Sequence, residues 1–218
     1  MKAIIFDMDG LMIDSERLYF QAEREIAWTF GREARDETLR KMMGRNPIEG
    51  MGILVRELEL PISPREAMDM RDDLMRQKMR TGLKAMPGLT YILEAFYGRL
   101  KLAISTGARK EFLDIAVDSL GIRDKFDLLQ ASDEITRGKP DPEIFLKTCG
   151  GLGLEPEQCI VLEDSENGVL AARRAGCFVI AVPSEYTHMQ DFRSAHFIAS
   201  DLEEAARHIE ALIRSGHY

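Results

Sequence analysis

The sequence has few of the residues that mark secreted, zinc-binding or nucleic-acid-binding proteins. Its 218 residues include only three cysteines, none in a C-x-x-C pair, so neither a disulfide framework nor a zinc site is indicated. The 29 Lys and Arg are outnumbered by 37 Asp and Glu, and the net charge of -8 argues against nucleic acid or an anionic membrane as a partner. No apolar run approaches the ~20 residues of a membrane span. The first residues also lack the apolar segment of a signal peptide. We therefore expect a cytoplasmic protein.

Short apolar runs alternate with helical patterns along most of the chain. The runs, which we interpret as buried strands, are residues 3–6, 100–104, 159–162, 178–182 and, more weakly, 197–199. The helical patterns between them are residues 110–120, 142–152 and 166–175. Such alternation predicts an α/β fold with a doubly wound, Rossmann-like parallel sheet and helices on both of its faces.

Residues 15–83 interrupt this alternation. They show no convincing strand pattern and read as successive helices separated by glycines and prolines. In the first helix Leu18, Ala22 and Ile26 recur at a spacing of four residues, which indicates one buried face. We predict an α/β core domain made of residues 1–14 and 84–218, with an inserted α-helical domain made of residues 15–83.

Reactive side chains occur where the predicted strands end, which is where ligands bind in open α/β sheets. The set consists of Asp7, Asp9, Ser105, Thr106, Lys139, Glu163 and Asp164. Converging carboxylates repel one another and need a cation, and hard oxygen ligands suit Mg²⁺. Hydroxyl and ammonium groups can bind phosphoryl oxygens, so the set predicts magnesium-dependent phosphoryl transfer.

Asp7 and Asp9 lie two residues apart in a tight turn and can divide the chemistry between them. One carboxylate can attack phosphorus to form an aspartyl-phosphate. The other can protonate the leaving oxygen and then take a proton from the water that hydrolyses the intermediate. Gly10 would allow the sharp turn and offer its amide to the phosphate.

Three ordered motifs give the chain a resemblance to the haloacid dehalogenase-like hydrolase superfamily. They are FDMDGLMIDSE at residues 6–16, GKPDP at residues 138–142 and EDSENGV at residues 163–169. The chain is similar to the subgroup that has a helical cap inserted after the first motif, which contains β-phosphoglucomutase and related phosphatases. The resemblance covers essentially the whole chain and implies that the insertion is a mobile cap that selects the substrate.

The resemblance also implies roles for the motif residues. Asp7 would be the nucleophile and a metal ligand, and Asp9 the acid and base, with its backbone carbonyl on the metal. Asp164 would bind the metal through its side chain, and Glu163 would be either a ligand or the partner of a ligand. Ser105 and Lys139 match the hydroxyl and lysine positions that contact the phosphoryl group, and Thr106 would add further donors.

The predicted cap departs from the mutase pattern. β-Phosphoglucomutase has a histidine on its first cap helix where this chain has Tyr19, and an arginine after a serine where this chain has Gly44-Arg45-Asn46. We interpret Glu16, Tyr19 and Arg45 as candidate substrate contacts in the cap.

The predicted function is that of a monomeric, magnesium-dependent phosphatase acting on a small phosphorylated metabolite, either a sugar phosphate or a nucleotide-like ester. One alternative is a mutase of the β-phosphoglucomutase type acting on a hexose 1-phosphate. A second alternative is a non-enzymatic signalling domain that carries a phosphorylated aspartate.

Overall fold

The computed structural model describes residues 1–43 and 47–215 of the chain. Its contacts divide the chain into two compact units, each described by itself below. The core unit consists of Met1–Asp14 and Lys84–Tyr218, and the helical unit consists of Ser15–Leu83.

The core unit is built on a six-stranded parallel sheet with the strand order β3-β2-β1-β4-β5-β6. The strands are β1 (Ala3–Phe6), β2 (Lys101–Ser105), β3 (Leu128–Gln130), β4 (Cys159–Glu163), β5 (Phe178–Ala181) and β6 (Phe197–Ile198). The expected doubly wound α/β fold is confirmed, because this order is that of a Rossmann-like sheet. The strand β3 was not expected from the sequence.

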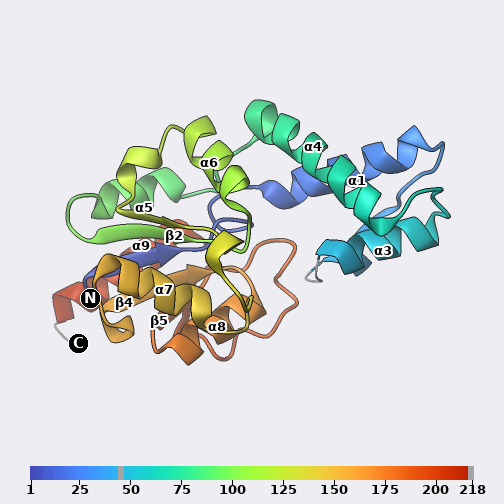
Figure 1. The fold of residues 1–218 in the computed structure, drawn as a ribbon. Helices are drawn as coiled ribbons and strands as arrows, with labels where there is room; N and C mark the ends of the chain where they lie inside the picture. Colours follow the sequence, from blue (N-terminus) through green and yellow to red (C-terminus); the bar gives the residue numbers. More distant parts are fainter. Residues whose placement is uncertain (44–46, 216–218) are drawn as a thin grey trace. The chain divides into compact units, whose positions relative to one another are not determined.

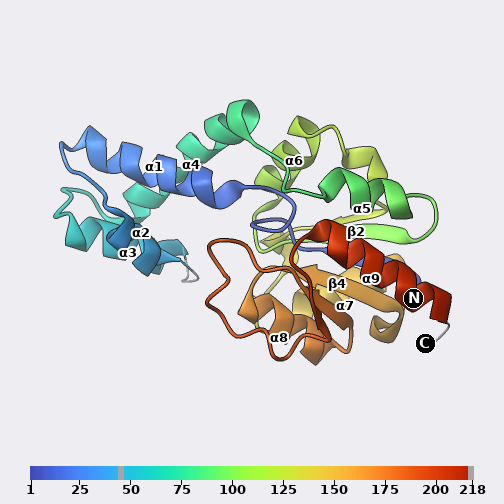
Figure 2. The same cartoon turned by 180° about the vertical axis from the view of Figure 1, so that it is seen from behind.

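Helices cover both faces of this sheet. The helices α7 (Glu143–Leu152) and α8 (Glu166–Ala175) lie on the face seen in Figure 1, and α5 (Leu89–Phe96) and α9 (Leu202–Ser215) lie on the face seen in Figure 2. The helix α6 (Lys110–Ser119) follows β2. Short 3₁₀ helices occur at Arg123–Lys125, Ser132–Glu134 and Pro156–Gln158.

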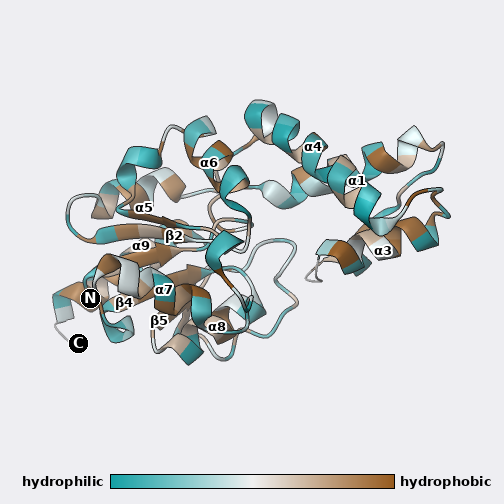
Figure 3. Cartoon of the chain, in the orientation of Figure 1, coloured by the Kyte–Doolittle hydropathy of each residue, from teal (hydrophilic) through white to brown (hydrophobic). Residues whose placement is uncertain are grey.

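The strands β1 and β4 run through the centre of the sheet and are completely buried. Ile5 and Val161 face a hydrophobic cluster to which α7 and α8 contribute Phe145 and Val169. Figure 3 shows these strands as hydrophobic, whereas the helices are hydrophobic on part of their surface only. Apolar surface buried on both faces holds the central strands rigidly in register, so that Phe6 pairs with Ile104 on one side and with Leu162 on the other.

In its described part, residues 15–43 and 47–83, the helical unit contains four helices. They are α1 (Ser15–Thr29), α2 (Asp36–Met42), α3 (Pro47–Glu57) and α4 (Pro64–Gly82). The helix α4 packs against both α1 and α3, and α2 packs against α3. The expected apolar face of α1 is buried, since Leu18, Ala22 and Ile26 are at most 1% exposed. None of the helices in residues 1–43 and 47–215 has the length and apolarity needed to cross a membrane.

Candidate active site in the core unit

The carboxylates predicted to act together lie at the carboxyl end of the central strands. Asp7 follows β1 and donates its backbone N–H to the carbonyl of Leu162, 3.0 Å away on β4. Glu163 ends β4, and Asp164 comes next. Oxygens of Asp7, Glu163 and Asp164 lie within 4.8 Å of one another, and all three residues are buried. The parallel pairing of β1 with β4 therefore brings together residues that are more than 150 positions apart in the sequence.

Lys139 extends into this cluster from the segment before α7. Its Nζ lies 2.5 Å from Oδ1 of Asp7 and 2.5 Å from Oε1 of Glu163. Burial works to lower the pKa of the Lys139 ammonium group, but the charges of Asp7 and Glu163 outweigh it, and the pKa is raised. Lys139 is therefore a permanent cation held between two carboxylates.

Both carboxylate oxygens of Glu163 accept hydrogen bonds from neighbouring residues. Oε1 accepts from Lys139, while Oε2 accepts from the backbone N–H of Ser165 at 3.1 Å and from its hydroxyl at 2.9 Å. Ser165 also caps α8, because its Oγ accepts from the N–H of Gly168. A Cβ on residue 168 would lie 1.9 Å from the carboxylate of Glu163, so only glycine leaves room for this side chain.

Gly10 makes room for Asp164. Its φ of +77° belongs to the left-handed region that glycine enters without strain. A Cβ at this position would lie 2.3 Å from Oδ2 of Asp164. The amide of Gly10 donates to the carbonyl of Ile13 at 3.0 Å. This differs from the expectation that the amide would bind phosphate, because the tight turn itself uses that donor.

The two hydroxyls after β2 point to different partners. The hydroxyl of Thr106 donates to Oδ2 of Asp9 at 3.3 Å, at the carboxyl ends of β1 and β2. The hydroxyl of Ser105 accepts instead from Thr148 on α7, at 3.1 Å. The sequence motif predicted Ser105 as the principal phosphate-binding hydroxyl. The geometry favours Thr106, because successive strand residues face opposite sides and it is the hydroxyl of Thr106 that contacts Asp9.

The charges of the cluster fit a bound cation. Burial raises the pKa of the Asp7 carboxyl group to about 8; the charges of Glu163 and Asp9 add to this effect, and Lys139 opposes it. Three buried carboxyl groups share one lysine, so ionising all three would leave an excess of negative charge, which a divalent cation with a preference for oxygen would neutralise. Asp7 and Asp164 are the side chains best suited to hold it, since both oxygens of Glu163 are already engaged.

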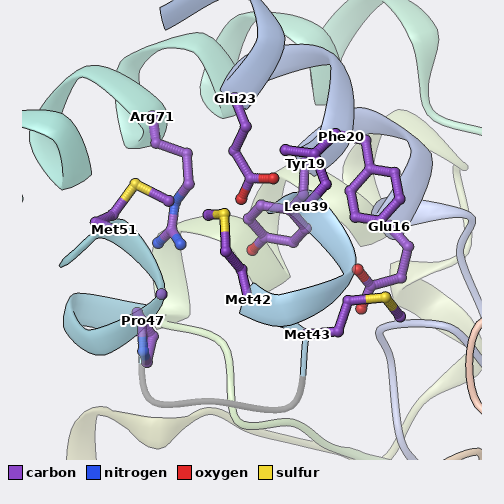
Figure 4. A pocket seen from close by; sticks show the side chains of 11 residues that line it. Glu16, Tyr19, Phe20, Glu23, Leu39, Met42, Met43, Pro47, Met51 and Arg71 are labelled. Atoms are coloured by element: carbon purple, nitrogen blue, oxygen red, sulfur yellow. The ribbon is translucent and has the colours of Figure 1, made fainter. Parts of the chain in front are cut away.

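The cap residues expected from the sequence fall in two groups. Glu16 and Tyr19 line a pocket of about 170 Å³ inside the helical unit (Figure 4). Arg45 lies outside the described residues.

The pocket also contains Glu23 and Arg71, which were not predicted from the sequence. The sequence pattern could have identified Glu23, because it shares one face of α1 with three other pocket residues. Glu16, Tyr19, Phe20 and Glu23 follow the i, i+3, i+4, i+7 spacing of a single helix face.

Comparison with known proteins identifies relatives of this chain. The model of the haloacid dehalogenase-like hydrolase family matches residues 4–182. A phosphorylated carbohydrates phosphatase of Thermotoga maritima is 36% identical over 81% of this chain and 82% of its own length. A fructose-1-phosphate phosphatase of Escherichia coli is 28% identical over 82% of this chain and 95% of its own length.

A solved structure gives the same result at the level of the fold. The crystal structure of CbbY from Rhodobacter sphaeroides in complex with phosphate superimposes with a TM-score of 0.82 at 25% identity. The match covers 94% of this chain and 96% of that chain. The likeness therefore extends over both units of the molecule.

Proposed function

The chain belongs to the haloacid dehalogenase-like hydrolases, as a phosphoric monoester hydrolase, and on this basis we propose that it is a magnesium-dependent phosphatase using an aspartyl-phosphate on Asp7. The observation that carries the proposal is the contact of the buried Asp7 carboxylate with Lys139, beside Glu163 and Asp164. Its substrate is a small phosphomonoester, a sugar phosphate or a nucleotide-like ester.

In the first half of the reaction an oxygen of Asp7 attacks phosphorus, and the bond to the ester oxygen breaks. Asp9 gives its proton to the departing oxygen, which leaves as an alcohol. The ammonium group of Lys139 and the hydroxyl of Thr106 neutralise charge on the phosphoryl oxygens. A magnesium ion held by Asp7 and Asp164 would supply further positive charge at the same oxygens.

In the second half Asp9 takes a proton from water, and the resulting hydroxide attacks phosphorus. The bond to Asp7 breaks, which releases inorganic phosphate and restores both carboxyl groups to their starting state. Without substrate the hydroxyl of Thr106 donates to the Asp9 carboxylate at 3.3 Å, and its single hydrogen turns to a phosphoryl oxygen when the substrate is bound. Glu163 positions the ammonium group of Lys139 by accepting its hydrogen bond at Oε1.

Phosphate release with Mg²⁺ over a panel of sugar phosphates, nucleotides and p-nitrophenyl phosphate tests the proposal. Asp7→Asn removes the nucleophile's charge at constant volume, and we expect it to reduce phosphate release at least a thousandfold without unfolding the protein. Asp124→Asn, at an exposed position, is the matched control and should keep wild-type activity. Residual activity of Asp7→Asn above a thousandth of wild type would exclude Asp7 as the nucleophile.

The mutase alternative uses the same aspartyl-phosphate but returns the phosphoryl group to a second hydroxyl of the sugar. Incubation with Mg²⁺ and a β-hexose 1-phosphate distinguishes the two reactions. A phosphatase yields free sugar and inorganic phosphate, whereas isomerisation with little free phosphate would overturn the proposal.

A further inference from the structure

The segment that carries Lys139 belongs to no helix or strand. It comprises residues 136–142, directly before α7, and its first three residues are exposed. Lysine has a flexible four-carbon side chain, so its ammonium group is placed only as precisely as the backbone that carries it. The contacts of Lys139 with Asp7 and Glu163, both at 2.5 Å, therefore require other interactions that fix this segment.

The carboxylate of Glu143, in the first turn of α7, binds the beginning of the segment. Its Oε1 accepts the N–H of Thr136 and its Oε2 accepts the N–H of Arg137, each at 2.9 Å. The N–H of Thr136 lowers the pKa of the Glu143 carboxyl group to about 2; Arg137 and Lys147 add to this effect, and burial opposes it. The group is therefore ionised near neutral pH, and its two charge-assisted hydrogen bonds close a loop that contains Lys139.

Two further contacts fix the backbone on the other side of Lys139. The N–H of Asp141 donates to the carbonyl of Gly138 at 3.0 Å, which closes a turn around the lysine. The guanidinium group of Arg174, on α8, donates to the carbonyl of Pro140 at 2.8 Å. The helices α7 and α8 pack against each other (Figure 1), so both ends of the segment are attached to one helical layer.

The helix α7 gives Glu143 a rigid base. Ile144 and Phe145, the next two residues, are at most 2% exposed and belong to the hydrophobic cluster that packs on the sheet. The ring centre of Phe145 lies 5.1 Å from Nζ of Lys139. The N–H of Glu143 donates to Oδ1 of Asp141 at 3.0 Å, which fixes the start of the helix. Glu143 therefore connects the exposed segment to the buried core.

We infer that Glu143 and Arg174 are positioning residues, which hold the backbone around Lys139 so that its ammonium group stays at the nucleophile. The inference rests on the proposed phosphatase function and adds to it two residues that act only through the lysine. The competing explanation for Glu143 is structural, because an acidic side chain in the first turn also stabilises a helix through the helix dipole.

Two substitutions of Glu143 separate positioning from charge. Glu143→Asp keeps the charge at the start of α7 but withdraws the carboxylate by one methylene group, so that it no longer reaches both amides. Glu143→Gln keeps the length of the side chain but leaves only one oxygen to accept from the two amides. With p-nitrophenyl phosphate and Mg²⁺ we expect each to lower kcat about tenfold or more, while KM changes less than about threefold, because the lysine acts on charge that develops in the transition state.

Glu203→Gln is the matched control. Glu203 also lies in the first turn of a helix, α9, and pairs with Arg207 four residues later, as Glu143 pairs with Lys147. Its kcat should equal that of the wild type within about twofold. A wild-type kcat in Glu143→Asp would overturn the inference, since charge alone would then suffice. A loss in Glu203→Gln as large as in Glu143→Gln would overturn it as well.

Arg174→Met tests the second contact at an exposed position of α8, where folding is not at risk. We expect kcat about threefold lower or more at an unchanged unfolding temperature, whereas Arg173→Met, at the neighbouring exposed position, should keep the wild-type kcat. Equal kcat values for these two variants would overturn the inference. A lower unfolding temperature of the Glu143 variants with unchanged kcat would also overturn it, because the role would then be structural. The phosphatase proposal fails separately, if the wild type with Mg²⁺ releases no phosphate from p-nitrophenyl phosphate or from any sugar phosphate.

Discussion

Glu163→Gln is the substitution that best tests how the active site is assembled. Glu163 is completely buried, and its two oxygens are shared between Lys139 and Ser165. Glutamine keeps the volume and can still accept from Ser165, but it removes the negative charge that faces Lys139. The variant therefore asks whether Glu163 positions the lysine or binds the cation directly.

The expected loss follows from the bond that is weakened. A hydrogen bond between charged groups contributes roughly 1.5–3 kcal/mol, and each ~1.4 kcal/mol corresponds to a factor of ten in rate. If Glu163 acts through Lys139, kcat should fall by about 10- to 100-fold. The concentration of Mg²⁺ that gives half-maximal activity should then change by less than about threefold, because the side chains proposed to bind the ion, Asp7 and Asp164, are unchanged.

Phosphate release measured as a function of Mg²⁺ concentration checks both numbers. Asp164→Asn is the comparison, because it should raise the half-saturating Mg²⁺ concentration by more than tenfold. Glu157→Gln, at an exposed position, is the matched control. A rise for Glu163→Gln as large as that for Asp164→Asn would refute the positioning role and make Glu163 a ligand.

Three further predictions concern local features of the structure. Gly10→Ala should reduce phosphate release at least a hundredfold with an unchanged circular dichroism spectrum, because the methyl group would displace Asp164. Ser63→Ala removes the capping box that α4 forms with Glu66, and urea unfolding should show a loss of about 1 kcal/mol. Glu23→Gln should remove a pH dependence: the Glu23 pKa is about 8 in the folded protein, against 4.5 for an ordinary glutamate, so the folded state retains a proton that the unfolded state releases. Wild-type stability, compared with the variant by chemical unfolding at each pH, should therefore fall between pH 4.5 and 8, by roughly 5 kcal/mol in total.

The central strands could be predicted from the sequence, whereas the edge strand β3 could not. Residues 3–6 of β1 and 159–162 of β4 are all apolar and buried, so the pattern alone identifies these two strands. The strand β3 has only three residues, all partly exposed, and pairs with β2 alone. Its extended conformation depends on that pairing, which no local pattern records.

The motifs predicted which residues of the core unit would meet but not how their donors are used. The spacing of Asp7 and Asp9 indicated a tight turn, but only the backbone geometry shows that Ile13 takes the amide of Gly10. The motif pattern assigned Ser105, and not its neighbour Thr106, to the principal hydroxyl position. Their directions depend on the end of β2 and on the position of Thr148, a residue more than 40 positions away.

Buried charged groups occur in both units, and the way they are satisfied separates their roles. In the core unit Lys139 has two carboxylate partners, so Lys139→Met would leave Asp7 and Glu163 buried without it and should cost about 3–5 kcal/mol of stability as well as turnover. In the helical unit Oε2 of Glu23 has no partner among the described residues, so an apolar replacement there should raise stability. Opposite changes in stability at the two positions would show that the first group is stabilised by its partners and that the second is buried at a cost in stability.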